Sequence, residues 1–73
     1  MNCIVEETRT YITSDSNQII GEISYEKVDI KTYNIYKLFI KKEAPAEIKQ
    51  TLIQKAKKYI QQQGFNVMIT YKD

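Results

Sequence analysis

The chain has 73 residues, of which 42% are hydrophobic and 27% are charged. A chain this short forms a single domain, here residues 1–73, because it can bury only about 60% of its unfolded surface around one small core. It has no histidine and a single cysteine, Cys3, which excludes imidazole catalysis, an internal disulfide and a cysteine zinc site. No apolar run approaches the roughly 18 residues that span a bilayer, and no signal-peptide pattern begins the chain. We therefore expect a cytoplasmic protein without a metal.

The net charge of +2 is unevenly distributed along the sequence. Residues 1–36 carry three basic and six acidic side chains, whereas residues 37–73 carry eight lysines and three acidic side chains. A basic half can attract nucleic acid or another anion. On a helix, however, Lys55, Lys57 and Lys58 point in separate directions, and no aromatic side chains alternate with them to stack on bases. Ordinary solvation of a helix is the favoured interpretation, and anion binding is the lesser alternative.

The first half of the sequence predicts three strands joined by short turns. Residues 8–13 are β-branched or aromatic, and residues 3–5 either begin the same strand or pair separately. Residues 19–28 alternate between apolar and polar side chains, as a half-buried strand does. Residues 33–40 predict a third strand, which we expect to form an antiparallel meander with the first two.

The third predicted strand has apolar side chains on both faces. Regular alternation places Tyr33, Ile35 and Phe39 on one face and Tyr36, Leu38 and Ile40 on the other. Because one helix covers one face of a sheet, the other face needs a cover. We expect a protein partner or a second copy of the chain to supply it, as exposed apolar patches favour association. The competing interpretation folds residues 1–7 across that face.

A helix and a last strand complete the sequence. Pro45 suits the first turn of a helix and Gly64 suits a left-handed C-cap, which predicts a helix over residues 45–63. Its apolar stripe comprises Ile48, Leu52, Ile53, Ala56, Tyr59 and Ile60, and Lys49 falls within the same arc. Residues 65–71 predict a strand parallel to its neighbour, since a helical crossover joins parallel strands.

The expected fold class is α+β. The strands and the helix form a mixed, mostly antiparallel four-stranded sheet in the order β-β-β-α-β, with the helix on one face. The predicted core comprises Ile23, Ile35 or Phe39, Leu52, Ala56, Ile60 and Val67.

The segments resemble the core of the GNAT acyltransferases. The resemblance rests on Tyr11-Ile12, on Ile20-Gly21-Glu22-Ile23-Ser24-Tyr25, on residues 35–40 and on the helix end Gln63-Gly64-Phe65. It covers about residues 9–71 and is greatest to the very short, stand-alone GNAT-like proteins of bacteria, of which this chain would be a truncated member. The resemblance implies a GNAT-like half-fold. It also implies a coenzyme A site between the third strand and the helix, where backbone amides and the helix N-terminus hold pyrophosphate.

The segment at that site departs from the family pattern. Residues 41–48 contain no glycine, Pro45 removes an amide donor, and Glu43 and Glu47 would repel phosphate. We therefore expect no cofactor. In the alternative interpretation acetyl-CoA binds through a non-standard loop in which lysines replace the glycine-loop amides. The cofactor-binding residues are then Phe39, Ile40, Lys41, Lys42 and Ala46.

These observations predict a non-catalytic GNAT-like domain that acts by binding protein. No catalytic residue is assigned, because Glu22 and Glu26, four positions apart on a strand, lie about 13 Å apart, too far for paired acid–base work. The alternative is an acyl-CoA-dependent N-acyltransferase. A lesser one is nucleic-acid or anion binding through the lysine-rich second half.

Overall fold

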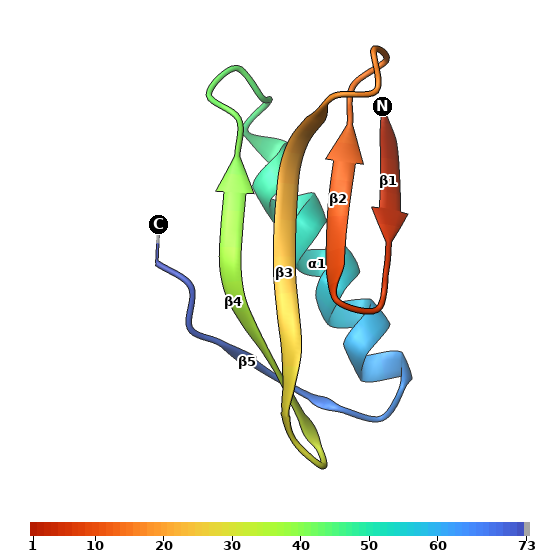
Figure 1. Cartoon of the computed structure of the whole chain (residues 1–73), viewed down its shortest axis with the longest axis vertical. Helices are drawn as coiled ribbons and strands as arrows, with labels where there is room; N and C mark the ends of the chain where they lie inside the picture. Colours follow the sequence, from red (N-terminus) through yellow and green to blue (C-terminus); the bar gives the residue numbers. More distant parts are fainter. Residues whose placement is uncertain (73) are drawn as a thin grey trace.

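The computed structural model, which describes residues 1–72, is a five-stranded sheet with one helix across one of its faces (Figure 1). The elements in chain order are β1 (Asn2–Val5), β2 (Arg9–Thr13), β3 (Ile19–Asp29), β4 (Thr32–Ile40), α1 (Glu47–Gln62) and β5 (Asn66–Ile69). The strands follow one another across the sheet in the order β1-β2-β3-β4-β5. Neighbours from β1 to β4 are antiparallel, and β4 and β5 are parallel. The α+β class, the meander and the parallel crossover are as predicted.

The sheet has five strands instead of the predicted four because β1 pairs separately. Asn2 lies opposite Thr13 and Val5 opposite Thr10, and the turn between β1 and β2 closes with a 2.7 Å bond from the amide of Glu6 to the carbonyl of Arg9. The N-terminal segment therefore extends the sheet at its edge. It does not fold across the uncovered face, so the competing interpretation for residues 1–7 is wrong. We call that uncovered face, opposite α1, the open face.

A β-bulge in β4 changes which of its side chains face the helix. Lys37 pairs with Ser24 and Ile35 pairs with Tyr25, which leaves Tyr36 as an extra residue without a partner on β3. The alternation is reversed at this point. Ile35 before the bulge and Leu38 and Ile40 after it lie on the helix side, in the core or packed against it.

The assignment of Leu38 and Ile40 to the face opposite Ile35 is therefore wrong. Tyr36 and Phe39 are the large apolar side chains of β4 that remain 46% exposed. The homodimer or protein partner stays a prediction, but one of its reasons, two continuous apolar faces on a single strand, is removed.

The core lies between α1 and the strands β2, β3 and β4. Its buried apolar residues are Ile12, Ile23, Tyr25, Ile35, Ile48, Leu52, Ala56 and Ile60. Of the two alternatives that regular alternation left open, Ile35 is buried and Phe39 is not. Val67 is partly buried and packs against the core. The helix begins two residues later than predicted, and β5 ends two residues earlier.

Aromatic rings close the interface where α1 ends. Tyr25 lies 6.3 Å from Tyr33 and 6.1 Å from Tyr59 between ring centroids, and Tyr33 lies 4.8 Å from Phe65. We call these four residues the aromatic cluster. Gly64, with φ of 88°, turns the chain out of the helix and into β5.

At the other end of the interface, α1 begins very close to the sheet. A Cβ atom placed on Gly21 would lie 2.8 Å from Cγ2 of Ile48 and 3.0 Å from Cδ1 of Leu52. Gly21 therefore permits the first turns of the helix to pack directly on β3.

The helix is too short and too polar to cross a membrane. Within residues 1–72, no three His, Cys, Asp or Glu side chains gather where a metal ion could bind.

Candidate functional site

A pocket of about 430 Å³ lies where β4 ends and α1 begins; we call it the β4–α1 pocket. Its lining consists of apolar side chains and three lysines: Leu38, Ile40, Lys41, Lys42, Ala44, Pro45, Ala46 and Lys49. Cationic groups beside an apolar surface suit a ligand that joins an anionic group to an apolar or amide-containing chain.

Local hydrogen bonds explain how the loop builds this pocket without glycine. The amide of Lys41 donates to the carbonyl of Ile20 at 2.8 Å and continues the pairing with β3. The amide of Ala44 donates to the carbonyl of Lys41 at 2.9 Å, which closes a turn. The amide of Ile48 donates to the carbonyl of Pro45 at 3.1 Å. The N-cap residue Ala46 provides no side-chain hydrogen bond. The first amides of the helix therefore have no side-chain cap, and the acidic residue of the first turn is Glu47.

The approach to the pocket runs along an unpaired edge of β4. Its parallel pairing with β5 spans Thr32 to Ile35, and a further 2.9 Å bond runs from the amide of Thr70 to the carbonyl of Ile35. The side chains of Asn34 and Thr70 bond to each other where β5 leaves the sheet. From Lys37 to Ile40, β4 pairs with β3 on one side and with no strand of the described chain on the other. Backbone groups on such an edge are open to a ligand or to another strand.

Positive charge surrounds the pocket, and the two nearest carboxylates in the sequence do not line it. The ammonium group of Lys41 donates a 3.1 Å hydrogen bond to Oε1 of Gln18, the residue before β3, and this bond holds the lysine side chain in place. Lys42 is exposed. Glu47 belongs to a different depression, on the β1 side of the helix, where it lies near Cys3 and Thr51. Glu43 is likewise absent from the lining. The two carboxylates that were expected from the sequence to repel phosphate therefore lie outside the lining of the pocket.

Four of the five residues named for the alternative cofactor site meet at this pocket. Ile40, Lys41, Lys42 and Ala46 line it. Phe39 does not, because it pairs with Glu22 on the open face. Whether the four hold a cofactor stays a prediction.

Sequence reasoning did not assign Leu38, Ala44, Pro45 and Lys49 to the site. The sequence contained a signal for Lys49, which is a charged residue within the apolar arc of the helix. It contained no signal for Leu38, because the direction of that side chain depends on the bulge.

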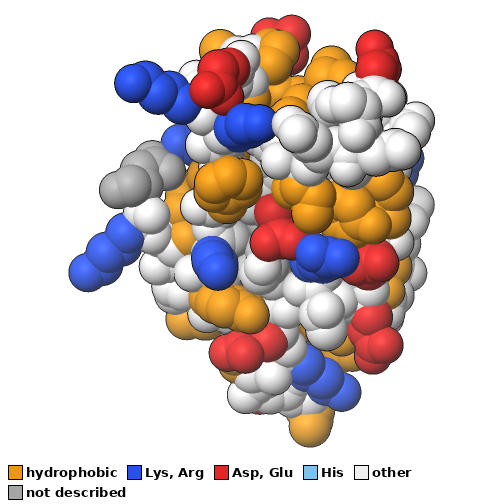
Figure 2. All heavy atoms as spheres, turned by 45° about the horizontal axis from the view of Figure 1, so that its top comes forward, with side chains coloured by type: hydrophobic (Ala, Val, Ile, Leu, Met, Phe, Trp, Pro, Cys, Tyr) orange, Lys and Arg blue, Asp and Glu red, His pale blue; other side chains and the backbone are white. Residues whose placement is uncertain are grey.

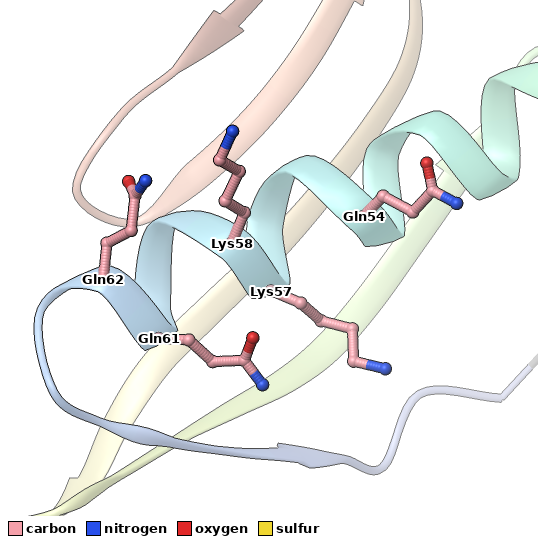
Figure 3. A pocket seen from close by; sticks show the side chains of 5 residues that line it. All are labelled: Gln54, Lys57, Lys58, Gln61 and Gln62. Carbon is pink, nitrogen blue, oxygen red and sulfur yellow. The ribbon is translucent and has the colours of Figure 1, made fainter.

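The outer surface of α1 contains a broader but open depression that offers no converging groups. It is lined by Gln54, Lys57, Lys58, Gln61 and Gln62, all from one helix. Figure 3 shows that these side chains spread to both sides of the helix and do not point toward a common centre. The depression does not form a site by itself.

Charged side chains on the open face form hydrogen bonds and ion pairs with one another. The guanidinium of Arg9 donates to Oε1 of Glu6 at 2.7 Å and to Oε2 of Glu22 at 2.6 Å, and it lies 4.3 Å from the centre of the Tyr11 ring. Figure 2 shows hydrophobic side chains separated by charged ones. The open face is therefore not a continuous apolar surface.

Comparisons with known proteins bear on the fold. No protein-family model and no curated protein sequence matches the chain. The solution structure of a "GCN5-like putative N-acetyltransferase" from Staphylococcus aureus matches with a TM-score of 0.73 and 20% identity, over 94% of this chain and 69% of that one. A "putative acetyl transferase" from Pyrococcus furiosus matches with a TM-score of 0.69 and 17% identity, over 89% of this chain and 47% of that one. At these identities the likeness shows the fold. The chain thus has a GNAT-like fold, as its sequence resemblance predicted.

Proposed function

We propose that this domain binds a phosphate-bearing thioester of the coenzyme A class at the β4–α1 pocket. The observation that carries the proposal is the composition of the pocket. Lys41 and Lys42 provide positive charge next to an uncapped helix start, and Leu38 and Ile40 provide an apolar wall. Lysine binds phosphate as a point charge where a backbone cradle is missing.

The unpaired edge of β4 suits the remainder of such a ligand. The arm of coenzyme A is an extended chain with two amide groups. The backbone of residues 36–40 lacks a strand on one side, so its free donors and acceptors can bond to those amides as an added strand would. The fold likeness to two proteins described as acetyltransferases supports the same class of ligand.

The proposal concerns binding and includes no transfer step. Acyl transfer to an amine needs a group that accepts the proton of the attacking nitrogen. Among the described residues, the lining of the pocket contains no carboxylate, phenol or thiol, and the sequence contains no histidine. We therefore propose a binding role.

A titration of the isotope-labelled chain with acetyl-CoA, followed by NMR, tests this proposal. We expect saturable amide shifts concentrated in residues 36–49. Replacing both lysines, as Lys41→Gln with Lys42→Gln, should weaken binding about tenfold or more, because each charge-assisted contact contributes about 1.5–3 kcal/mol.

Lys31→Gln is the matched control, since Lys31 is exposed in the turn between β3 and β4, at the far end of β4 from the pocket. It should leave the affinity unchanged. No saturable shift at millimolar ligand, or an equal effect of the control, would contradict the proposal.

A further inference from the structure

Positive charge continues beyond the β4–α1 pocket along α1. From residue 48 to residue 72 the sequence contains no aspartate or glutamate, whereas it contains Lys49, Lys55, Lys57, Lys58 and Lys72. Six of the nine acidic residues precede residue 37, in the strands and turns of the sheet. Charge is therefore separated between the helix layer and the sheet.

Most of these lysines are not neutralised inside the molecule. Within residues 1–72, Met1 forms an ion pair with Asp15, and Arg9 forms ion pairs with Glu6 and Glu22. Lys42, Lys55, Lys57 and Lys58 have no acidic partner within residues 1–72. Their charge is available to another molecule.

One side of the helix links these charges to the pocket. Lys49 lines the pocket, and Lys57 follows eight residues later, about 80° round the helix and about 12 Å further along it. Lys55 is about 160° away from Lys57, on the opposite side. Figure 3 shows Lys57 and Lys58 reaching outward on different sides of α1. We call Lys42, Lys49 and Lys57 the basic flank.

The basic flank carries more positive charge than the binding of one phosphate group at the pocket requires. The pocket also lacks a glycine loop, whose successive backbone amides would hold a pyrophosphate. A phosphopantetheine arm fits both observations, because it carries a single phosphodiester and is attached to a protein. Acidic residues around the attachment point would face the basic flank while the arm enters the pocket.

We infer that the ligand of the β4–α1 pocket is presented by an acidic carrier protein, on a phosphopantetheine thioester, and that this protein docks along the basic flank. The inference rests on the proposed function and names its partner. Nucleic acid is less suitable, because the basic flank contains no aromatic side chain on which bases could stack.

Binding measurements on the complete chain at low and high salt test this inference. The probes are an acidic acyl carrier protein acetylated on its phosphopantetheine thiol, the same carrier without the arm, and acetyl-CoA. We expect the acetylated carrier to bind about tenfold more tightly than either other probe at low salt, with the advantage over acetyl-CoA lost at high salt.

Lys57→Glu should weaken binding of the acetylated carrier about tenfold, which is about 1.4 kcal/mol, and leave binding of acetyl-CoA within twofold. Lys55→Glu is the matched control, since it makes the same charge change on the opposite side of the same helix. It should change carrier affinity less than threefold. Circular dichroism should show that both variants keep the helix.

The possible outcomes separate the two proposals. If acetyl-CoA binds but the carrier binds no more tightly, or if the two variants have equal effects, the carrier inference fails and the proposed function stands. If the carrier binds equally well with and without its arm, the carrier inference fails, and the proposed function then stands only if acetyl-CoA itself binds. If a single-stranded oligonucleotide binds more tightly than the acetylated carrier, the carrier inference fails in favour of nucleic acid.

Discussion

The two ends of the interface between α1 and the sheet differ in the size of their side chains. Near the end of the helix the rings of the aromatic cluster fill the space, and Tyr25 is 1% exposed although it is one of the largest side chains. Near the start of the helix, Ala44 and Ala46 are small, and lysines surround a pocket. One helix and one sheet thus form a closed core at one end and an accessible site at the other.

The largest expected effect comes from the region between the two ends. Leu52, on α1, is fully buried and packs against β3 at Gly21. Leu52→Ala should lower the free energy of unfolding by about 2–5 kcal/mol, because it removes buried methyl groups and leaves a cavity. Chemical denaturation measures the change. A loss below about 0.5 kcal/mol would show that the middle of the interface is not packed as described.

Crowding at the start of the helix is tested at Gly21. Gly21→Ala places a methyl group 2.8 Å from Ile48 and 3.0 Å from Leu52, so the Ile48 side chain or the helix start must shift, at a cost of about 1–3 kcal/mol. Because Ile48 lies in the first turn of α1, ligand binding at the β4–α1 pocket should weaken as well.

Gly64→Ala is the corresponding change at the other end of α1. A Cβ there would meet no atom within 4 Å, but φ is 88°, so the cost is backbone strain of roughly 1–2 kcal/mol. It should leave ligand binding unchanged. Equal effects of the two variants on binding would show that the helix start does not position the pocket.

The smallest effect concerns the hydroxyl group of Tyr25. It donates a 2.6 Å bond to the carbonyl of Glu6 and lies 3.0 Å from the hydroxyl of Thr10. Tyr25→Phe should therefore lower stability by about 1 kcal/mol. Tyr36→Phe, at an exposed position, should have no measurable effect.

Alkaline pH gives a second readout for the same residue. Burial raises the pKa of Tyr25, so the folded state holds the phenol proton more tightly than the unfolded state does. Stability from this group is complete below the ordinary tyrosine pKa of about 10 and is lost as pH rises above it. As the pH rises above about 10, the wild-type chain should lose stability more steeply than Tyr25→Phe. Parallel curves would contradict the burial of this hydroxyl.

The periodic parts of the fold were predictable from the sequence. The apolar stripe of α1 repeats every three or four residues, and β3 alternates over Gly21, Ile23 and Tyr25, so both elements and the face that each buries follow from spacing. The turn after α1 was predictable from Gly64. The pairing of β1 was not, because Cys3 to Val5 suits either a separate strand or a segment across the open face.

The pocket was predictable in part for a similar reason. Residues 40–46 are contiguous, so a loop at the helix start brings them together in any crossover of this kind. Phe39 was misplaced and Leu38 was missed because the bulge reverses their directions, and no glycine marks the bulge. Which lysines of α1 share a side with the pocket depends on how the helix sits on the sheet, and spacing within the helix does not determine that.

Tyr36 is an insertion in the alternation of β4. Its side chain is outside the core, so many residue types suit the position. Without this residue Lys37 would follow Ile35 directly, and the pairing with β3 would be regular. Regular alternation would then keep Ile35, Leu38 and Ile40 toward the helix and Lys37 and Phe39 away from it. The bulge is therefore a place where β4 can lose one residue without turning its core side chains toward water.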